Sequence, residues 1–344
     1  MVEVEVEVEV EVEVVVEAPA RSRFSVAFCT GTRRMARRDR SHTTMHSCAE
    51  ASRRLAPQWP SGTVRLMERS IVHDVHMTIN LAHRFVYFVP EAAEEYAAVG
   101  VTGRGAYFGS RAAPMGALPD EVVIATFYNF SPRAVASAMP GVWDAASPAV
   151  LQAARFRVVR RALDRVAAAL SPAGIAEARS LIDPVVAGLV LAGKPLAAAN
   201  AAVALPDDPM VALWQQVTVL REWRGDVHIA VLIANEVGPC ECMVLQVGTG
   251  RFPLAVTQAS RQWDEQEWAA AIAGLAARGW VDAGGAMTAA GNEARERIED
   301  DTDLLCTPIW QPIGDKGASR LGELLAPIHD AMDAAGTYAA LAQR

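Results

Sequence analysis

Residues 264–291 read DEQEWAAAIAGLAARGWVDAGGAMTAAG, and this stretch indicates a helix, a tight turn and a second helix. Asp264 and Glu267 have the spacing of a capping box, in which each side chain accepts a hydrogen bond from the other residue's backbone N–H. Gly279 is expected to end the first helix, and residues 279–288 are predicted to form a short β-ribbon, or wing. The order of these elements is that of a winged helix.

The same stretch resembles the MarR-type pattern, in which a helix ends in an Arg-Gly-aromatic-Val step and Thr-x-x-Gly follows the wing. Here the two motifs are RGWV at 278–281 and TAAG at 288–291. A surface that reads DNA needs hydrogen-bond donors and positive charge, yet residues 264–303 hold ten acidic residues and three arginines. The charge therefore favours a structural or interaction role for this module over DNA binding.

The composition favours helices in the rest of the chain. Hydrophobic residues make up 51% of the 344 residues, aromatic residues only 6%, and alanine is abundant. No apolar run reaches the roughly 18 residues that a membrane-spanning helix needs. We expect a mainly α, soluble and cytoplasmic protein: a multi-helical body with a C-terminal winged-helix-like module. The expected parts are a helical domain at 67–200, a helical plus winged-helix-like domain at 201–330 and a tail at 331–344.

The first 66 residues differ from the rest. Residues 2–14 alternate valine and glutamate, and residues 21–54 carry nine arginines without a clear period. We expect residues 1–66 to be a disordered extension, or the product of a start codon assigned too far upstream. A nucleic-acid-binding arginine arm is the alternative, and N-terminal mass spectrometry of the native protein distinguishes the two.

Local signals predict several helices of the body. Residues 67–88 have apolar positions at helical spacing, and Pro90 ends that run. Ser-Pro pairs at 131–132 and 147–148 place serine at the N-cap and proline at the first helical position. Residues 120–130 are rich in β-branched and aromatic residues, so they fit a strand and a buried helix equally well.

Five further motifs accompany these elements: LAH at 81–83, YFVPE at 87–91, YF at 107–108, RAAPMG at 111–116 and LREWRGDVH at 220–228. Together with the winged segment they resemble the SalK-like family of helix-turn-helix proteins from high-GC bacteria. The resemblance covers about residues 69–330 and agrees with a chain start near Met67. It implies a fold with a helix-turn-helix and implies no particular reaction.

The RGDVH element at residues 224–228 is the first candidate site. Gly225 is expected to break the chain between two helices, and Asp226 to cap the second of them. In one interpretation an Arg224–Asp226 bond holds this break together. In the other, Arg224 and Asp226 bind a ligand while His228 transfers a proton. Both interpretations are open, because capping explains Asp226 but does not require Arg224 and His228.

Tyr107 and Arg111 are the second candidate pair, since residues four apart share a helix face and the small residues beside Arg111 leave room for a ligand. A tyrosine packed over an arginine stem explains the pair as simply. His83 is a candidate acid or base, and it lies within an arc of about 80° with His73 and His76 on one predicted helix. No carboxylate with matching spacing completes a metal site there, so no metal is expected.

The cysteines and the motifs that are missing narrow the chemistry. Five cysteines without disulfide or zinc spacing fit a reducing compartment, and Cys240 and Cys242 are expected to fill space as buried thiols. The sequence contains no G-x-S-x-G, P-loop, dinucleotide fingerprint or H-E-x-x-H motif, and it identifies no cofactor.

The favoured hypothesis is that the helical body encloses a polar pocket for a small organic ligand, as a binding protein or as an accessory enzyme of secondary metabolism. A buried polar group without a partner costs about 1–3 kcal/mol, so the uncommon polar residues of these apolar helices are expected to converge. They are His83, Tyr107, Arg111, Arg224, Asp226 and His228. The alternative is a winged-helix DNA-binding transcriptional regulator, with DNA the less favoured partner. A homodimer is expected from the way winged-helix proteins pair.

Overall fold

The computed structural model describes residues 67–250 and 253–339, and every named element in these two ranges is a helix. The predicted mainly α fold is therefore confirmed. The predictions for residues 1–66 and for the end of the C-terminal tail lie outside the described residues.

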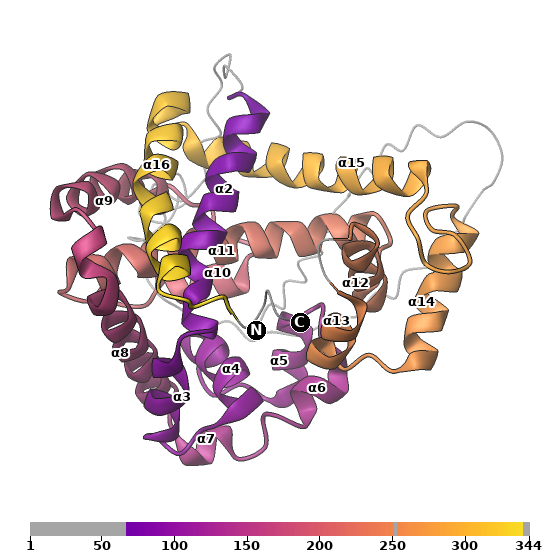
Figure 1. Cartoon of the computed structure of the whole chain (residues 1–344), viewed down its shortest axis with the longest axis horizontal. Helices are drawn as coiled ribbons and strands as arrows, with labels where there is room; N and C mark the ends of the chain where they lie inside the picture. Colours follow the sequence, from indigo (N-terminus) through magenta and orange to yellow (C-terminus); the bar gives the residue numbers. More distant parts are fainter. Residues whose placement is uncertain (1–66, 251–252, 340–344) are drawn as a thin grey trace, which may run out of the picture. The chain divides into compact units, whose positions relative to one another are not determined.

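The helices follow one another closely along the chain (Figure 1). Up to residue 201 the α-helices are α2 Arg69–His83, α3 Pro90–Ala97, α4 Gly103–Ala112, α5 Asp120–Thr126, α6 Pro132–Ala136, α7 Val142–Ala145, α8 Pro148–Val166, α9 Pro172–Ala187 and α10 Pro195–Ala201. They are followed by α11 Pro209–Ala234, α12 Pro239–Gly248, α13 Leu254–Arg261, α14 Glu265–Ala277, α15 Ala289–Cys306 and α16 Gly314–Ala334. Short 3-10 helices lie at η1 Arg84–Tyr87, η2 Ala113–Met115, η3 Ala167–Ala169 and η4 Thr307–Trp310.

Local capping signals set many of the helix starts. Ser131 and Ser147 accept hydrogen bonds from the backbone N–H groups of Ala134 and Val150, and a proline follows each serine, as predicted. Residues 120–130, where a strand and a helix fitted the sequence equally well, hold α5.

Helix α11 is the central element of the fold. It packs against α2, α9, α10 and α15, and Figure 1 shows α15 lying alongside it. Trp214, Val217 and Leu220 of α11 are buried. A helix that is apolar on most sides is one that other helices surround. Polar side chains of α11 therefore face the interior of the helical body.

The predicted helix break at Gly225 is wrong, because α11 continues without interruption through this residue. A glycine inside a helix costs about 1 kcal/mol relative to alanine. Burial of large side chains such as Trp223 and Val227 on either side contributes more than this cost. Asp226 therefore does not cap a helix of its own. Its carboxylate instead accepts a hydrogen bond of 3.0 Å from the backbone N–H of Ala197, in the first turn of α10.

Residues 264–291 fold only partly as predicted. Asp264 and Glu267 form the capping box at the start of α14, and Gly279, with φ of 71°, ends that helix. The predicted β-ribbon is reduced to a single bridge between Val281 and Met287. A longer ladder cannot form, because the chain enters α15 directly after the bridge.

Helix α2 packs along α16 and α11, and this brings the N-terminal and C-terminal helices of the described chain together. The described residues belong to one compact unit, and the division at residues 200 and 330 stays a prediction. Within the described residues no single helix has the length and apolar composition to cross a membrane. Only α11 and α12 taken together pass that test, as a pair bent by 101°.

Candidate functional site

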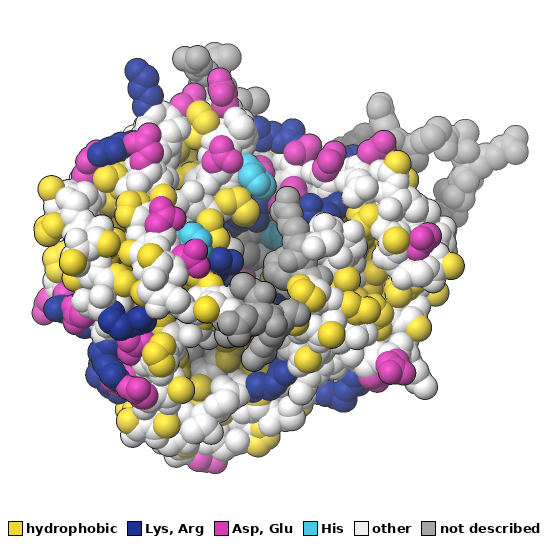
Figure 2. All heavy atoms as spheres, in the orientation of Figure 1, with side chains coloured by type: hydrophobic (Ala, Val, Ile, Leu, Met, Phe, Trp, Pro, Cys, Tyr) yellow, Lys and Arg dark blue, Asp and Glu magenta, His cyan; other side chains and the backbone are white. Residues whose placement is uncertain are grey.

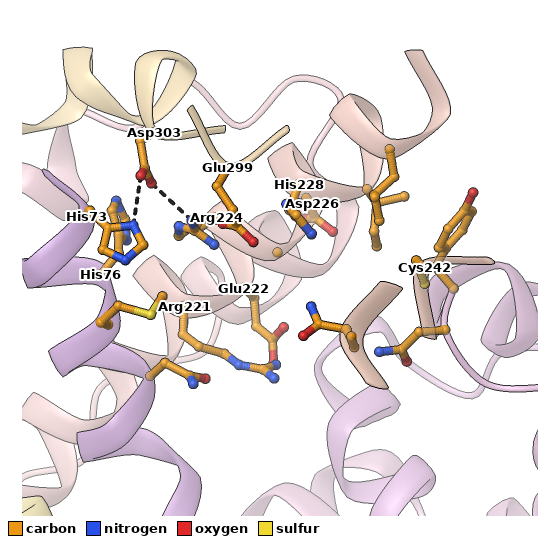
Figure 3. A pocket seen from close by; sticks show the side chains of 18 of the residues that line it. His73, His76, Arg221, Glu222, Arg224, Asp226, His228, Cys242, Glu299 and Asp303 are labelled. Carbon is orange, nitrogen blue, oxygen red and sulfur yellow. Dashed lines mark hydrogen bonds and ion pairs between the residues drawn. The ribbon is translucent and has the colours of Figure 1, made fainter. Parts of the chain in front are cut away.

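A cavity of about 890 Å³ lies along α11. Its walls come mainly from α2, α11, α12 and α15, with further residues from α4, α5 and α10. Figure 3 shows that charged and histidine side chains from α2, α11 and α15 point toward one another across it. Its volume lies within the range of roughly 300–1,000 Å³ that is usual for small-molecule sites.

Four of the six predicted site residues line this cavity: Arg111, Arg224, Asp226 and His228. Tyr107 lies directly behind the wall, because its hydroxyl oxygen accepts a hydrogen bond of 3.0 Å from Arg111. His83 does not line the cavity. The structure therefore brings together most of the residues that the sequence singled out.

The inner end of the cavity is the part lined by Arg111, Arg221 and Glu222, and Glu222 lies between the two arginines. Nη2 of Arg111 donates to both of its carboxylate oxygens at 3.1 Å, and Nη1 of Arg221 donates to one of them at 2.6 Å. Burial alone would raise the pKa of Glu222. The opposing charges of Arg111 and Arg221 outweigh burial and lower the pKa to about 2. Glu222 is thus a carboxylate at any physiological pH.

His83 lies in the core between α2 and α11. Its ring stacks on Trp214 with the ring centroids 5.0 Å apart, and its Nε2 accepts a hydrogen bond of 3.4 Å from Arg155. Burial, and then the nearby arginine charges, hold its pKa well below the usual value. Its place in the core separates it from the other predicted acid or base, His228.

Arg224 and Asp303 together link three helices at the outer end of the cavity, the part that these two residues and Glu299 line. Its Nη2 donates to Glu299 at 2.9 Å and to Asp303 at 3.0 Å, both on α15. Asp303 also accepts a hydrogen bond of 2.9 Å from Nδ1 of His73 on α2, and Figure 3 marks both bonds of Asp303. Two carboxylates therefore already balance the charge of the guanidinium that was predicted to bind an anion.

His228 has a defined tautomer. Its Nδ1 lies 3.0 Å from the hydroxyl oxygen of Thr302, and that hydroxyl donates its only hydrogen to the carbonyl oxygen of Ile298 at 2.7 Å. Thr302 must then accept from Nδ1–H of His228, which leaves the lone pair on Nε2. Burial lowers the pKa of His228, so its neutral form is favoured.

Asp226 is the titratable residue between these two ends. Burial raises the pKa of its carboxyl group to about 6 against the hydrogen bond from Ala197, and the nearby charge of Glu222 raises it further. Asp226 can therefore change its charge near neutral pH.

Comparison with known proteins gives one finding. Residues 72–339 match the model of a helix-turn-helix family. The chain belongs to this helix-turn-helix family. No curated protein and no solved structure matches the chain. The matched range includes α11, α12 and α15, so most of the cavity wall belongs to the part of the chain that defines the family.

Histidine and cysteine side chains, which can bind metal ions, also line the cavity of this helix-turn-helix protein. Within the described ranges, no three His, Cys, Asp or Glu side chains are arranged to hold a metal ion. Cys242 lines the cavity, and burial raises the pKa of Cys240 and Cys242 to about 12. Both are neutral thiols. His76, on the cavity wall, accepts a hydrogen bond of 3.3 Å from the indole N–H of Trp310.

Several site residues of this helix-turn-helix protein were missed in the sequence: Arg221, Glu222, Glu299 and Asp303. For Arg221 a signal existed, because residues 221, 225 and 228 repeat at the spacing of one helix face. The expectation of a break at Gly225 hid that pattern. The carboxylates of α15 gave no local signal, since their partners lie on α2 and α11.

Proposed function

We propose that the cavity along α11 binds a small organic molecule. The observation that supports this most directly is that four polar residues chosen from the sequence line one cavity of about 890 Å³. The SalK-like resemblance extends the proposal: the ligand belongs to secondary metabolism, and the protein either binds it or assists a reaction on it. In a reaction, the Nε2 lone pair of His228 and the carboxyl group of Asp226 are the groups able to accept or give a proton.

Gly225 allows a direct test, because it lies on the cavity floor in the middle of α11. A Cβ atom there meets only Oε2 of Glu222, at 3.8 Å. Gly225→Leu should therefore fill the cavity without disturbing the helix, and leucine favours helix over glycine. A thermal-shift screen of a metabolite library against wild type should find compounds that raise Tm by about 5 °C at a hundredfold excess over Kd.

Gly225→Leu should abolish these shifts while its own Tm equals or exceeds that of wild type. Ala230→Leu is the matched control, because Ala230 is an exposed position of the same helix and lies outside the cavity. It should keep the wild-type response. The proposal fails if every stabilising compound acts equally on wild type and Gly225→Leu.

A second candidate function is DNA binding by a winged-helix module, and the family match favours it. In this proposal α12, α13 and α14 are the three helices of the module, residues 279–288 are the wing and α14 is the reading helix. Helix α12 packs against both α13 and α14, which gives such a module its own contacts. Because residues 264–303 are rich in acidic side chains, we place DNA binding below ligand binding. Homodimer formation stays a prediction for either function.

A further inference from the structure

The positive charge around Glu222 exceeds what this one carboxylate can balance. Arg111 and Arg221 bond to Glu222, and the charge of Arg155 acts on the same carboxylate. Arg261 is close enough to Arg111 for their charges to repel each other. Arg155 and Arg261 do not line the cavity and form no ion pair within the described residues, whereas Arg111 and Arg221 both pair with Glu222 and with no other described carboxylate. Buried charges of one sign are costly unless a counter-charge is supplied.

Arg221 is the arginine of this group that can reach a ligand. Both terminal nitrogens of Arg111 are engaged, since Nη1 donates to Tyr107 and Nη2 to both oxygens of Glu222. Arg221 uses Nη1 for Glu222, and its remaining N–H groups have no hydrogen bond to any described residue. Its side chain is 24% exposed and lines the cavity, compared with 8% exposure for Arg111. Glu222 thus holds Arg221 in place while leaving donors free.

His228 lies two helical turns further along α11 and offers a hydrogen-bond acceptor, whereas Arg221 offers donors. Thr302 fixes its tautomer, so Nε2 is an acceptor, and no described residue donates to that atom. Seven residues along an α-helix advance roughly 10 Å and return to nearly the same face. Gly225 lies between Arg221 and His228 on that face and leaves the floor between them open.

We propose that the ligand of this cavity is an elongated organic acid whose carboxylate binds Arg221 and whose hydroxyl or N–H group donates to Nε2 of His228. The inference rests on the proposed function and names the ligand class of the same site. A free carboxylate at Arg221 supplies the missing negative charge at the inner end, and charge-assisted hydrogen bonds to a guanidinium are the strong ones. A donor at the other end satisfies the free acceptor of His228, which gives the ligand a direction in the cavity.

Straight-chain probes test this class. The probes are ω-hydroxycarboxylic acids from 6-hydroxyhexanoate to 12-hydroxydodecanoate, each with two matched molecules of equal length: the unsubstituted carboxylic acid and the α,ω-diol. Calorimetric titration of wild type should give the tightest binding for a hydroxy acid of intermediate length. The matched acid should bind more weakly because it lacks the donor, and the matched diol because it lacks the charge, each by about tenfold.

Two variants assign the ends of the probe. Arg221→Met should lower the affinity for the hydroxy acid and the acid by about tenfold or more and leave the diol unchanged. Arg295→Met is its control, because Arg295 is a cavity arginine near the outer end, paired with Glu299. His228→Asn retains a donor for Thr302 and removes the Nε2 acceptor, so it should erase the advantage of the hydroxy acid over the matched acid.

Thr302 is a positioning residue in this proposal, and its test is spectroscopic. In Thr302→Val the imidazole nitrogen shifts of His228, read by ¹⁵N NMR, should change from the Nδ1–H tautomer toward a mixture of both tautomers. The preference for the hydroxy acid over the matched acid should fall with it. A variant that merely lost packing would not change the tautomer.

The outcomes separate this inference from the proposed function. If diols bind wild type as tightly as hydroxy acids, or if Arg221→Met leaves acid binding unchanged, the ligand class is wrong. The proposed function then still stands provided Gly225→Leu blocks the binding. If no probe binds but library compounds stabilise wild type and not Gly225→Leu, the inference again fails alone. If no compound of any class distinguishes wild type from Gly225→Leu, the proposed function fails as well.

Discussion

Asp226 accepts a hydrogen bond from the backbone N–H of Ala197 in the first turn of α10, and its side chain also lines the cavity. Its pKa of about 6 in the folded protein exceeds the value of roughly 3.9 of an unfolded aspartate. The folded state therefore binds the proton more tightly. Its contribution to stability is greatest below about pH 4 and is lost as the pH rises through 6.

Asp226→Asn should remove this loss, because the amide oxygen can still accept from Ala197 and carries no charge. The free energy of unfolding of Asp226→Asn relative to wild type should rise between pH 4.5 and 7.5 by about 1–3 kcal/mol, the lower end being favoured because the side chain is partly exposed. Urea denaturation at the two pH values measures it. Asp301→Asn, at an exposed position, controls for the change in net charge. A difference that stays constant with pH would show that Asp226 is ionised normally.

Residue-scale prediction from the sequence worked within one helix and failed between helices. Arg224 and His228 were found because they are uncommon polar residues in an apolar stretch, and both line the cavity. The partner of Arg111 is Glu222, which lies 111 residues further along the chain. No spacing rule connects positions so far apart, so the structure was needed to show that Arg221 shares its one carboxylate with Arg111, whereas Arg224 pairs with two.

At the scale of elements, the junction between the single β-bridge and α15 depends on a close approach of two backbones. Thr288 caps α15 by accepting from the N–H of Gly291 at 3.0 Å, and its hydroxyl donates to the carbonyl of Gly279 at 2.6 Å. A Cβ atom at Gly291 would overlap the carbonyl oxygen of Trp280 and lie 2.7 Å from its carbonyl carbon. The Thr-x-x-Gly motif is thus explained by a cap and a contact that only glycine permits.

Gly291→Ala should therefore destabilise the protein by about 1–3 kcal/mol, since the backbone of Trp280 must move to admit the methyl group. Gly225→Ala is the matched control: it is also a glycine within a helix, but its Cβ would meet only Oε2 of Glu222, at an ordinary contact distance of 3.8 Å. That change should stabilise by up to about 1 kcal/mol through helix propensity. Thermal or urea denaturation of both variants measures the difference. Equal effects of the two substitutions would mean that the contact with Trp280 does not decide the outcome.

Helix starts could be predicted from the sequence because caps are local. Ser131, Ser147 and Asp264 each accept from a backbone N–H within the next three residues, so their neighbours are enough to identify them. Whether Gly225 ends a helix depends on what buries the residues around it. That burial comes from α2, α9, α10 and α15, which no window of sequence around Gly225 contains.

At the scale of the whole molecule, the charge around α14 decides between the two candidate functions. Arg133 forms ion pairs with Asp264 and Glu267 at the start of α14, so the charge of this arginine is already balanced by carboxylates. Arg278, at the end of α14, donates to the backbone carbonyls of Asn235 and Glu236 and lies over the ring of Trp280. These arginines hold the module against the helical body. Figure 2 also shows acidic side chains along α15, which follows residues 279–288.

Phosphate binding requires cations that are free to replace counterions, and affinity then falls steeply as salt rises. Because the cations beside α14 already have partners, wild type should give no salt-sensitive shift of duplex DNA, including its own upstream region, in gel-shift assays at about 50 mM salt. Glu265→Lys is an informative comparison, because Glu265 is exposed at the first turn of α14 and takes no part in the capping box. If α14 can enter a groove, this variant should gain weak binding that disappears by about 200 mM salt. Tight binding by wild type that Arg278→Ala weakens would instead place DNA recognition on this module and reverse the order of the two functions.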